Sequence, residues 1–170
     1  SSEIPIVFPE YEYKITQKEG KLFIFDGIAK KYRALTPEEW VRQHCLNFIT
    51  EHLNYPASNI QIERNHKIDQ LNRRTDIQVY DTNGQVFMLI ECKAPHIPIT
   101  SITFQQASQY QKKNQAKYLV LTNGLENYIY QIDINKQETF LLDQFPLAGQ
   151  GFIAMADIAT PDGVVRLAAP

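Results

Sequence analysis

Two carboxylic acids and a lysine occupy the ends of two short runs of residues that favour β-strands. Asp76, Glu91 and Lys93 belong to the runs 75–80 and 86–92 or directly follow them. Carboxylate oxygens are the ligands that hard divalent cations prefer, and a nearby ammonium group can orient water or balance negative charge. The three residue types together predict a site that binds a metal ion and activates water.

The pairing of the two predicted strands decides whether these side chains meet. With Asn83-Gly84 as a two-residue hairpin loop, Asp76 lies directly opposite Glu91, and Lys93 shares their face because side chains alternate along a strand. A four-residue loop would pair Asp76 with Leu89 and keep the face, with Glu91 as the diagonal neighbour. A three-residue loop would break the arrangement, so the prediction depends on the turn.

An acidic pair at this place is unfavourable unless something neutralises it. Carboxylates directly opposite each other repel, since their Cβ atoms are only about 5 Å apart. Glu91 also ends the apolar run Val86–Ile90, which is typical of a strand buried on both faces. Lys93 supplies one positive charge, and Mg²⁺ or Mn²⁺ would supply another. The alternative is a Glu–Lys pair on a solvated sheet edge, with Asp76 merely ending a strand.

The surrounding sequence predicts an α/β domain. Thr36 and Pro37 are typical of a helix start, and that helix should end near residues 54–56. A second helix is expected at about 102–114. Further strands are expected at 60–68, 117–122 and 128–132, with an edge strand at 139–142. The order α-β-β-β-α-β-β indicates a mixed sheet flanked by helices.

The predicted organisation has three parts. Residues 1–35 should form an N-terminal β-hairpin extension, with strands at 11–16 and 21–25 around a turn at 17–20. Residues 36–142 should form the core. Residues 143–170 are expected to form a C-terminal tail, either loosely packed or with short strands.

Several motifs of the chain resemble known nucleases. Asp76 followed by Glu91-Cys92-Lys93 resembles the D…(D/E)-x-K signature of the PD-(D/E)xK nuclease superfamily. Over about residues 25–135, the chain is similar to the N-terminal nuclease domain of type I restriction enzyme R subunits. The similar stretches are Pro37–Gln43, Arg73–Ile77, Leu89–Pro95, Gln106–Tyr110 and Leu121–Gly124. Thr75 departs from the pattern, since many members have proline before the Asp.

The resemblance implies a restriction-endonuclease-like fold and metal-dependent hydrolysis of DNA phosphodiester bonds. Asp76, Glu91 and the main-chain carbonyl of Cys92 would hold Mg²⁺ or Mn²⁺, and Lys93 would be catalytic. An acid on the first helix assists metal binding in that family, and Glu38 matches its position.

Helical periodicity also favours Glu38 over its neighbour. With Val41 at 0°, Glu38 lies at about 60° and therefore within the predicted apolar face, whereas Glu39 lies at about 160° and outside it. The alternative is that Glu38 is an ordinary acid in the first turn of a helix.

The predicted second helix carries the remaining site candidates. Gln106 and Tyr110 are four residues apart and so share a helix face. The resemblance places them beside the acids, where they would bind a phosphate or the metal-bound water. As an alternative, Gln and Tyr at this spacing are common on helix surfaces.

Basic residues around the predicted site favour a phosphodiester substrate. Residues 60–120 contain eight Lys or Arg and five acids, although the whole chain has a net charge of −2. Arg73, Arg74 and Lys112 are the candidate contacts to a nucleic-acid backbone, and such contacts carry no base specificity. Ordinary solvated surface charge is the alternative.

The composition excludes several other classes of protein. The 170 residues are 44% hydrophobic and contain no long apolar run, which fits one globular domain and predicts no membrane contact. Cys45 and Cys92 form no disulfide framework and indicate a reducing cytoplasm. The sequence contains no Gly-x-x-x-x-Gly-Lys-Ser/Thr loop, so we expect no nucleotide cofactor.

The sequence leaves three other hypotheses open. Partner subunits could supply the motor or the specificity that type I restriction requires. The domain could also be a non-catalytic nucleic-acid- or protein-binding module that keeps the nuclease fold. It could finally be a structural domain that keeps only the fold, with its acids as surface features.

Overall fold

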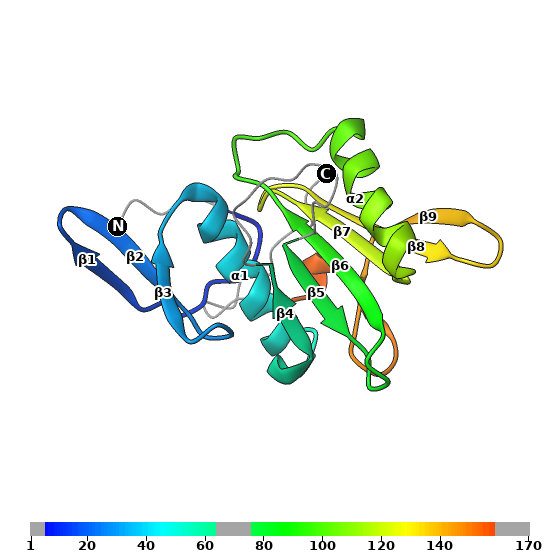
Figure 1. Ribbon diagram of the computed structural model, residues 1–170, viewed down its shortest axis with the longest axis horizontal. Helices are drawn as coiled ribbons and strands as arrows, with labels where there is room; N and C mark the ends of the chain where they lie inside the picture. The colour runs from blue at the N-terminus through cyan, green and yellow to red at the C-terminus, as the bar shows by residue number, and fades with distance from the viewer. Residues whose placement is uncertain (1–5, 64–75, 159–170) are drawn as a thin grey trace.

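The computed structural model describes residues 6–63 and 76–158 and contains a three-stranded and a six-stranded β-sheet with a helix between them, besides a short two-stranded sheet (Figure 1). The N-terminal sheet is antiparallel, in the order β1-β2-β3. Helix α1 (Pro37–Glu51) separates it from the larger sheet, and α2 (Ser101–Asn114) covers the far face of the larger sheet. The strands of the small sheet are β1 (Ile15–Lys18), β2 (Lys21–Asp26) and β3 (Lys31–Ala34).

The larger sheet has six strands in the order β4-β5-β6-β7-β8-β9. Neighbouring strands are antiparallel except β6 and β7, which are parallel and joined through α2. This mixed sheet with flanking helices confirms the predicted α/β fold. The strands are β4 (Ile60–Ile62), β5 (Ile77–Tyr80), β6 (Val86–Cys92), β7 (Tyr118–Thr122), β8 (Asn127–Asp133) and β9 (Glu138–Leu142).

Alternation along the central strands divides the core into two layers. On β6, Met88, Ile90 and Cys92 pack on the α1 side, whereas Leu89 packs on the α2 side with Leu119 of β7. Each helix therefore buries its own face of one sheet. Both predicted helix starts are confirmed, with Thr36 and Thr100 as the N-caps.

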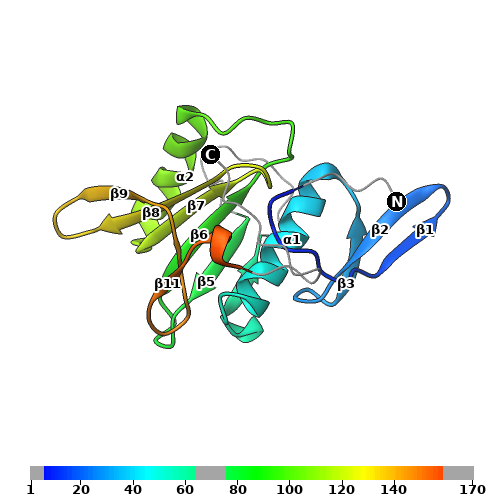
Figure 2. The ribbon, with the colours of Figure 1, turned by 180° about the vertical axis from the view of Figure 1, so that it is seen from behind.

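Part of the C-terminal segment packs on the α1 side of the sheet (Figure 2). It contains β10 (Phe145–Pro146), β11 (Phe152–Ile153) and a 3₁₀ turn, η3 (Met155–Asp157). Phe145 contacts Phe48 of α1 with ring centroids 4.9 Å apart, and Met155 is fully buried. The rest of the predicted tail, 159–170, lies outside the described residues.

The N-terminal strands differ from the prediction. The first strand begins at Ile15 instead of Tyr11, because Tyr11 and Tyr13 pack their rings against α1. Tyr13 lies 5.0 Å from Trp40 between ring centroids. A third strand, β3, follows a turn at residues 27–30, so the hairpin is extended to three strands.

The predicted strand at 60–68 begins at Ile60 as expected. Its described part is strand at Ile60–Ile62, and residues 64–68 of the prediction lie outside the described part of the chain. Nowhere in the described ranges is a helix long and apolar enough to cross a membrane.

Candidate active site

The β5–β6 hairpin has the register that the sequence predicted. Ile77 pairs with Ile90 and Gln78 with Leu89, so one further step places Asp76 opposite Glu91. Side chains directly opposite in an antiparallel pair project from the same face. That face is the one covered by α2, since Glu91 is two residues beyond Leu89 and therefore shares its face.

The turn that produces this register is not the predicted one. Asp81 donates its N–H to the carbonyl of Gln85 at 2.8 Å, which leaves the three loop residues 82–84. The Asp81 carboxylate accepts N–H groups from Asn83 and Gln85, and Gly84 has φ +78°. Because Gly tolerates this left-handed conformation, a three-residue loop forms readily.

A bulge then restores the register. Val79 pairs with Met88 but Tyr80 pairs with Val86, so Phe87 is an extra residue on β6. The bulge shifts the pairing by one residue and compensates for the odd loop. The prediction of a two-residue loop was therefore wrong, but the strand pairing that it implied is correct.

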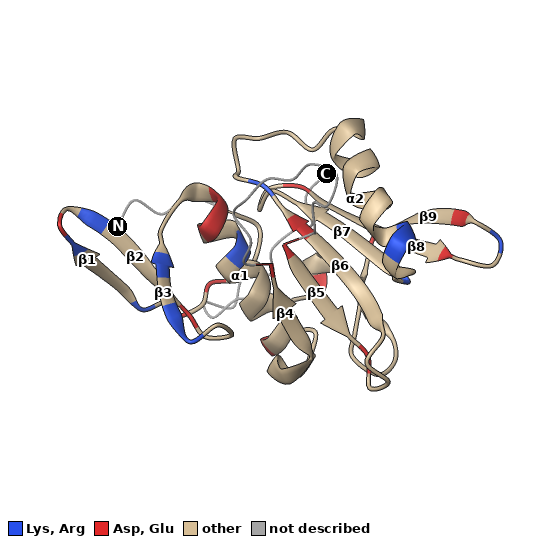
Figure 3. Cartoon of the chain, viewed as in Figure 1, with Lys and Arg blue, Asp and Glu red and all other residues tan. Residues whose placement is uncertain are grey.

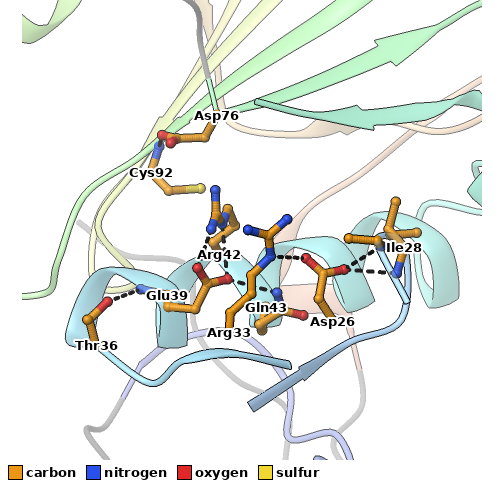
Figure 4. Close-up of polar contacts among 10 residues, drawn as sticks. Asp26, Ile28, Arg33, Thr36, Glu39, Arg42, Gln43, Asp76 and Cys92 are labelled. Atoms are coloured by element: carbon orange, nitrogen blue, oxygen red, sulfur yellow. Dashed lines mark hydrogen bonds and ion pairs between the residues drawn. The ribbon is translucent and has the colours of Figure 1, made fainter. Parts of the chain in front are cut away.

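Backbone contacts hold the ends of the two strands together. The Asp76 carboxylate accepts the N–H of Cys92 at 2.8 Å (Figure 4). Lys93 donates its own N–H to the carbonyl of Thr122 at 2.8 Å, which extends the parallel β6–β7 ladder past the end of β6. The Lys93 ammonium lies 3.2 Å from a carboxylate oxygen of Glu91, which is only 5% exposed. Asp76, Glu91 and Lys93 are thus brought together.

The Asp76 carboxyl lies in an environment that disfavours its charge. Burial and then the negative charges of Glu91 and Glu38 raise its pKa to about 8. The Cys92 N–H and the positive charge of Arg42 act in the opposite direction. Figure 3 shows acidic segments at these ends of β5 and β6. A group in this state is stabilised by gaining either a proton or a cation.

The donor set suits a hard divalent cation with few protein ligands. Asp76 and Glu91 offer carboxylate oxygens, and the main-chain carbonyl of Cys92 lies between Glu91 and Lys93 in sequence. Within residues 6–63 and 76–158, no group of three or more His, Cys, Asp or Glu side chains is arranged to hold a metal ion. Mg²⁺ is commonly bound through one or two carboxylates with water in its other positions, so two facing acids are compatible with it.

The two acids at the start of α1 are reversed relative to the prediction. Glu38 is exposed, whereas Glu39 is buried. The periodicity argument assumed one buried helix face, but α1 is covered by the six-stranded sheet on one side and by the N-terminal segment on the other. Glu38 nevertheless lies near enough for its charge to raise the pKa of Asp76.

Glu39 belongs to a set of paired polar groups beside the site (Figure 4). Its carboxylate accepts hydrogen bonds from the guanidinium of Arg42 and, at 2.8 Å, from the amide of Gln43. Farther along, Arg33 of β3 donates to the buried carboxylate of Asp26 at 2.7 Å. The Ala29 N–H, Arg33 and Gln43 lower the pKa of Asp26 even though its burial acts to raise it.

The helix residues predicted from the resemblance lie on α2. Gln106 is exposed, and Tyr110 packs partly buried against the apolar cluster on the Glu91 side of the sheet. Lys112 is exposed in the last turn of α2. Arg73 and Arg74, the other predicted nucleic-acid contacts, lie outside the described residues.

The sequence reasoning missed the turn that positions Lys93. Thr122 ends β7, and its hydroxyl accepts the N–H of Gly124 at 3.0 Å. Gly124 has φ +85°, and a Cβ there would lie 2.7 Å from the Ile6 side chain. The Asn123 carboxamide accepts two further N–H groups and donates to the carbonyl of Ile97. The Thr-Asn-Gly triplet was the available signal, since such residues favour turns.

Arg42 was also missed as part of the site. Its guanidinium is held by Glu39, and its positive charge lowers the pKa of Asp76. Its spacing from Glu39 at i and i+3 is a signal for a helical ion pair. Periodicity had placed Glu39 outside the apolar face, so an ion pair between Glu39 and Arg42 was not expected beside the site.

A family model described as the N terminus of the type I restriction enzyme R protein matches residues 37–146. This match begins with α1 and ends with β10, so it contains α1, α2 and all of the six-stranded sheet that carries the acids. No curated protein matches the chain. Because the family model spans well over half of the 170 residues, the chain belongs to the family of type I restriction enzyme R protein N-terminal domains.

Proposed function

We propose that this domain is a metal-dependent endonuclease of the PD-(D/E)xK type that hydrolyses phosphodiester bonds in DNA. The observation that carries the proposal is the facing pair Asp76 and Glu91, with the pKa of Asp76 raised and the Lys93 ammonium 3.2 Å from Glu91. Perturbed acids of this kind cluster at functional sites. The family match supports the same reaction class.

In this proposal, Asp76, Glu91 and the Cys92 carbonyl hold Mg²⁺ or Mn²⁺, and Glu38 assists from the start of α1. When bound, the cation polarises the scissile phosphate and lowers the pKa of the attacking water. Arg42 limits the charge repulsion at Asp76 from the side of the helix.

The basic residues act on the substrate. Lys93 is held by the β6–β7 ladder, so its ammonium can orient the attacking water or stabilise the negative charge on the oxygens of the pentacovalent phosphate. Gln106 and Tyr110 position the phosphate from α2. Arg73, Arg74 and Lys112 bind the DNA backbone without reading its sequence.

The family also suggests how the domain is used. Type I restriction couples DNA cleavage to other activities, and the family match connects this domain with such a system. From the family, we propose that it acts in the cytoplasm with partner subunits that supply the motor or the specificity.

The proposal is tested by nicking of a supercoiled plasmid in Mg²⁺ or Mn²⁺. We expect slow nicking that EDTA abolishes and that Lys93→Ala lowers by about 10²- to 10³-fold, as for other losses of a charge-stabilising donor. Lys113→Ala, at an exposed α2 position, is the matched control and should nick like the wild type.

Two results would contradict the proposal in different ways. Nicking that survives both EDTA and Lys93→Ala would assign the activity to another site or to a contaminant. Metal-dependent stabilisation without nicking would favour a module that binds nucleic acid or protein and needs a partner chain for activity.

A further inference from the structure

The N-terminal sheet concentrates positive charge in a chain that is acidic overall. Residues 14–34 contain five exposed lysines and one exposed acid, Glu19. Asp26 and Arg33 neutralise each other in the interior. The preceding acids, Glu10 and Glu12, lie before β1. Figure 3 shows basic segments on all three strands. The lysines are Lys14, Lys18, Lys21, Lys30 and Lys31.

The strand register shows which residues of the N-terminal sheet project away from α1, and three of the five lysines are among them. Ile24 and Asp26 are fully buried toward α1, so positions that alternate with them project outward. Phe25 donates its N–H to the carbonyl of Lys14, which extends the β1–β2 pairing by one residue. We call the outward positions the basic sheet face. They are Lys14, Thr16, Lys18, Lys21, Phe23, Phe25, Tyr32 and Ala34.

The charges on this face are arranged unfavourably for the free protein. Lys18 and Lys21 are directly opposite each other across the β1–β2 turn, and like charges at such positions repel. All positions of the basic sheet face lie in the described part of the chain, and none of them is acidic. An anion that lies along the face would relieve the repulsion.

Two aromatic rings lie on this face near Lys14, at the end away from Lys18 and Lys21. Tyr32 is 47% exposed and packs edge-on against Phe25, with ring centroids 5.2 Å apart. The Lys14 ammonium lies 5.3 Å above the Phe25 ring, which fixes the direction of its charge. The face thus carries three exposed lysines together with aromatic rings, and its back is anchored to α1 through Asp26, Arg33 and Gln43.

We propose that the basic sheet face binds the phosphate backbone of duplex DNA outside the cleavage site. The occupant follows from charge complementarity, because a polyanion with regularly spaced phosphates matches exposed lysines on a sheet face that carries no acid, with Glu19 of the β1–β2 turn as the one exposed acid nearby. The inference rests on the proposed function in that the same duplex is the nuclease substrate. It adds a second contact region, separated from the acids of β5 and β6 by α1 (Figure 1).

The test measures binding without cleavage. Fluorescence anisotropy of a labelled duplex of arbitrary sequence is followed in EDTA at several salt concentrations. We expect Lys18→Glu/Lys21→Glu to weaken binding at least tenfold at low salt. The slope of log K against log salt should become shallower by about two, since each lost phosphate contact removes about one unit. Lys18→Gln/Lys21→Gln should show a smaller loss of the same kind and serves if the Glu variant does not fold.

The matched control has the same change in net charge elsewhere. Lys117→Glu/Lys136→Glu alters exposed lysines directly before β7 and in the β8–β9 turn, on the other side of α1 from the basic sheet face and outside the residues proposed to contact DNA. It should bind within twofold of the wild type. Equal losses in both double variants, or a change below twofold in the Lys18/Lys21 pair, would overturn the proposal.

Failure of this proposal can be separated from failure of the nuclease proposal. Binding is measured in EDTA, so it does not depend on the acids or on cleavage. If the wild type binds through Lys18 and Lys21 but never nicks DNA, the surface stands and the nuclease proposal fails. If the wild type nicks DNA and the Lys18/Lys21 variant binds as well as the wild type, the surface proposal fails by itself.

Discussion

Two groups of buried or partly buried acids lie close together in this domain, and they differ in whether positively charged side chains of the protein neutralise them. Asp26 and Glu39 are each paired with an arginine, and the surroundings of Asp26 lower its pKa. Asp76 instead faces Glu91 and has a raised pKa. The fold thus satisfies one group with its own cations and leaves the other short of positive charge.

The difference separates structural acids from candidate functional ones. A buried carboxylate with matched donors stabilises its surroundings, and removing it leaves a buried cation unpaired. A carboxylate held against another acid costs stability until a proton or a metal ion arrives. Arg42 joins the two groups, since it is held by Glu39 and also lowers the pKa of Asp76.

The largest effect on stability is expected for Asp26→Asn. The amide keeps an oxygen for the N–H groups of Ile28 and Ala29 but leaves the buried Arg33 guanidinium without its counter-charge. We expect a loss of about 3 kcal/mol in the free energy of unfolding, measured by urea denaturation without metal. The double variant Asp26→Leu/Arg33→Met should recover part of this loss. If Asp26→Asn is as stable as the wild type, then the ion pair of Asp26 with Arg33 does not stabilise the fold.

A smaller effect should distinguish the two neighbouring acids of α1. Glu39→Gln weakens the pairing of the mostly buried Arg42, so we expect a loss of about 1 to 2 kcal/mol in unfolding free energy without metal. Glu38→Gln, at an exposed position, should leave that value within about 0.5 kcal/mol. It should instead reduce the rise in melting temperature caused by Mn²⁺. A large loss for Glu38→Gln and none for Glu39→Gln would support the prediction from periodicity, in which Glu38 points inward and Glu39 outward.

The smallest effect is expected for Asp76→Asn, and it should have the opposite sign. The amide oxygen can still accept the Cys92 N–H, while the repulsion with Glu91 is removed. In EDTA we expect the unfolding free energy to stay unchanged or rise by up to about 1 kcal/mol. The stabilisation that Mg²⁺ or Mn²⁺ gives the wild type should disappear. Asp81→Asn, in the hairpin turn, is the control and should keep the metal response.

The difference in stability between Asp76→Asn and the wild type should depend on pH. Because the folded pKa of Asp76 is raised from 3.8 to about 8, its neutral form stabilises the fold fully below pH 4. That stabilisation is lost as pH rises through about 8. The melting temperature of Asp76→Asn relative to the wild type should therefore increase between pH 4 and pH 8 in EDTA. An Asp76→Asn protein that melts well below the wild type at pH 8 would show that the carboxylate is a satisfied structural group.

The local sequence carried enough information for the fold and for the acid pair. Alternating apolar residues identified the central strands, and Thr36-Pro37 marked the start of α1. The pairing of Asp76 with Glu91 was predicted correctly because both strands must place their apolar residues in the core, which strongly limits the register. The loop has three residues where two were predicted, and the bulge at Phe87 compensates for the extra residue, so Asp76 still pairs with Glu91.

The remaining features were decided by tertiary packing. The inward position of Glu39 depends on the N-terminal sheet that covers the second side of α1, which the periodicity of one helix cannot reveal. Likewise, Lys18 and Lys21 become one basic surface only through the β1–β2 register. The physical reason is that periodicity reports which side chains avoid water, whereas the identity of their partners depends on segments distant in sequence.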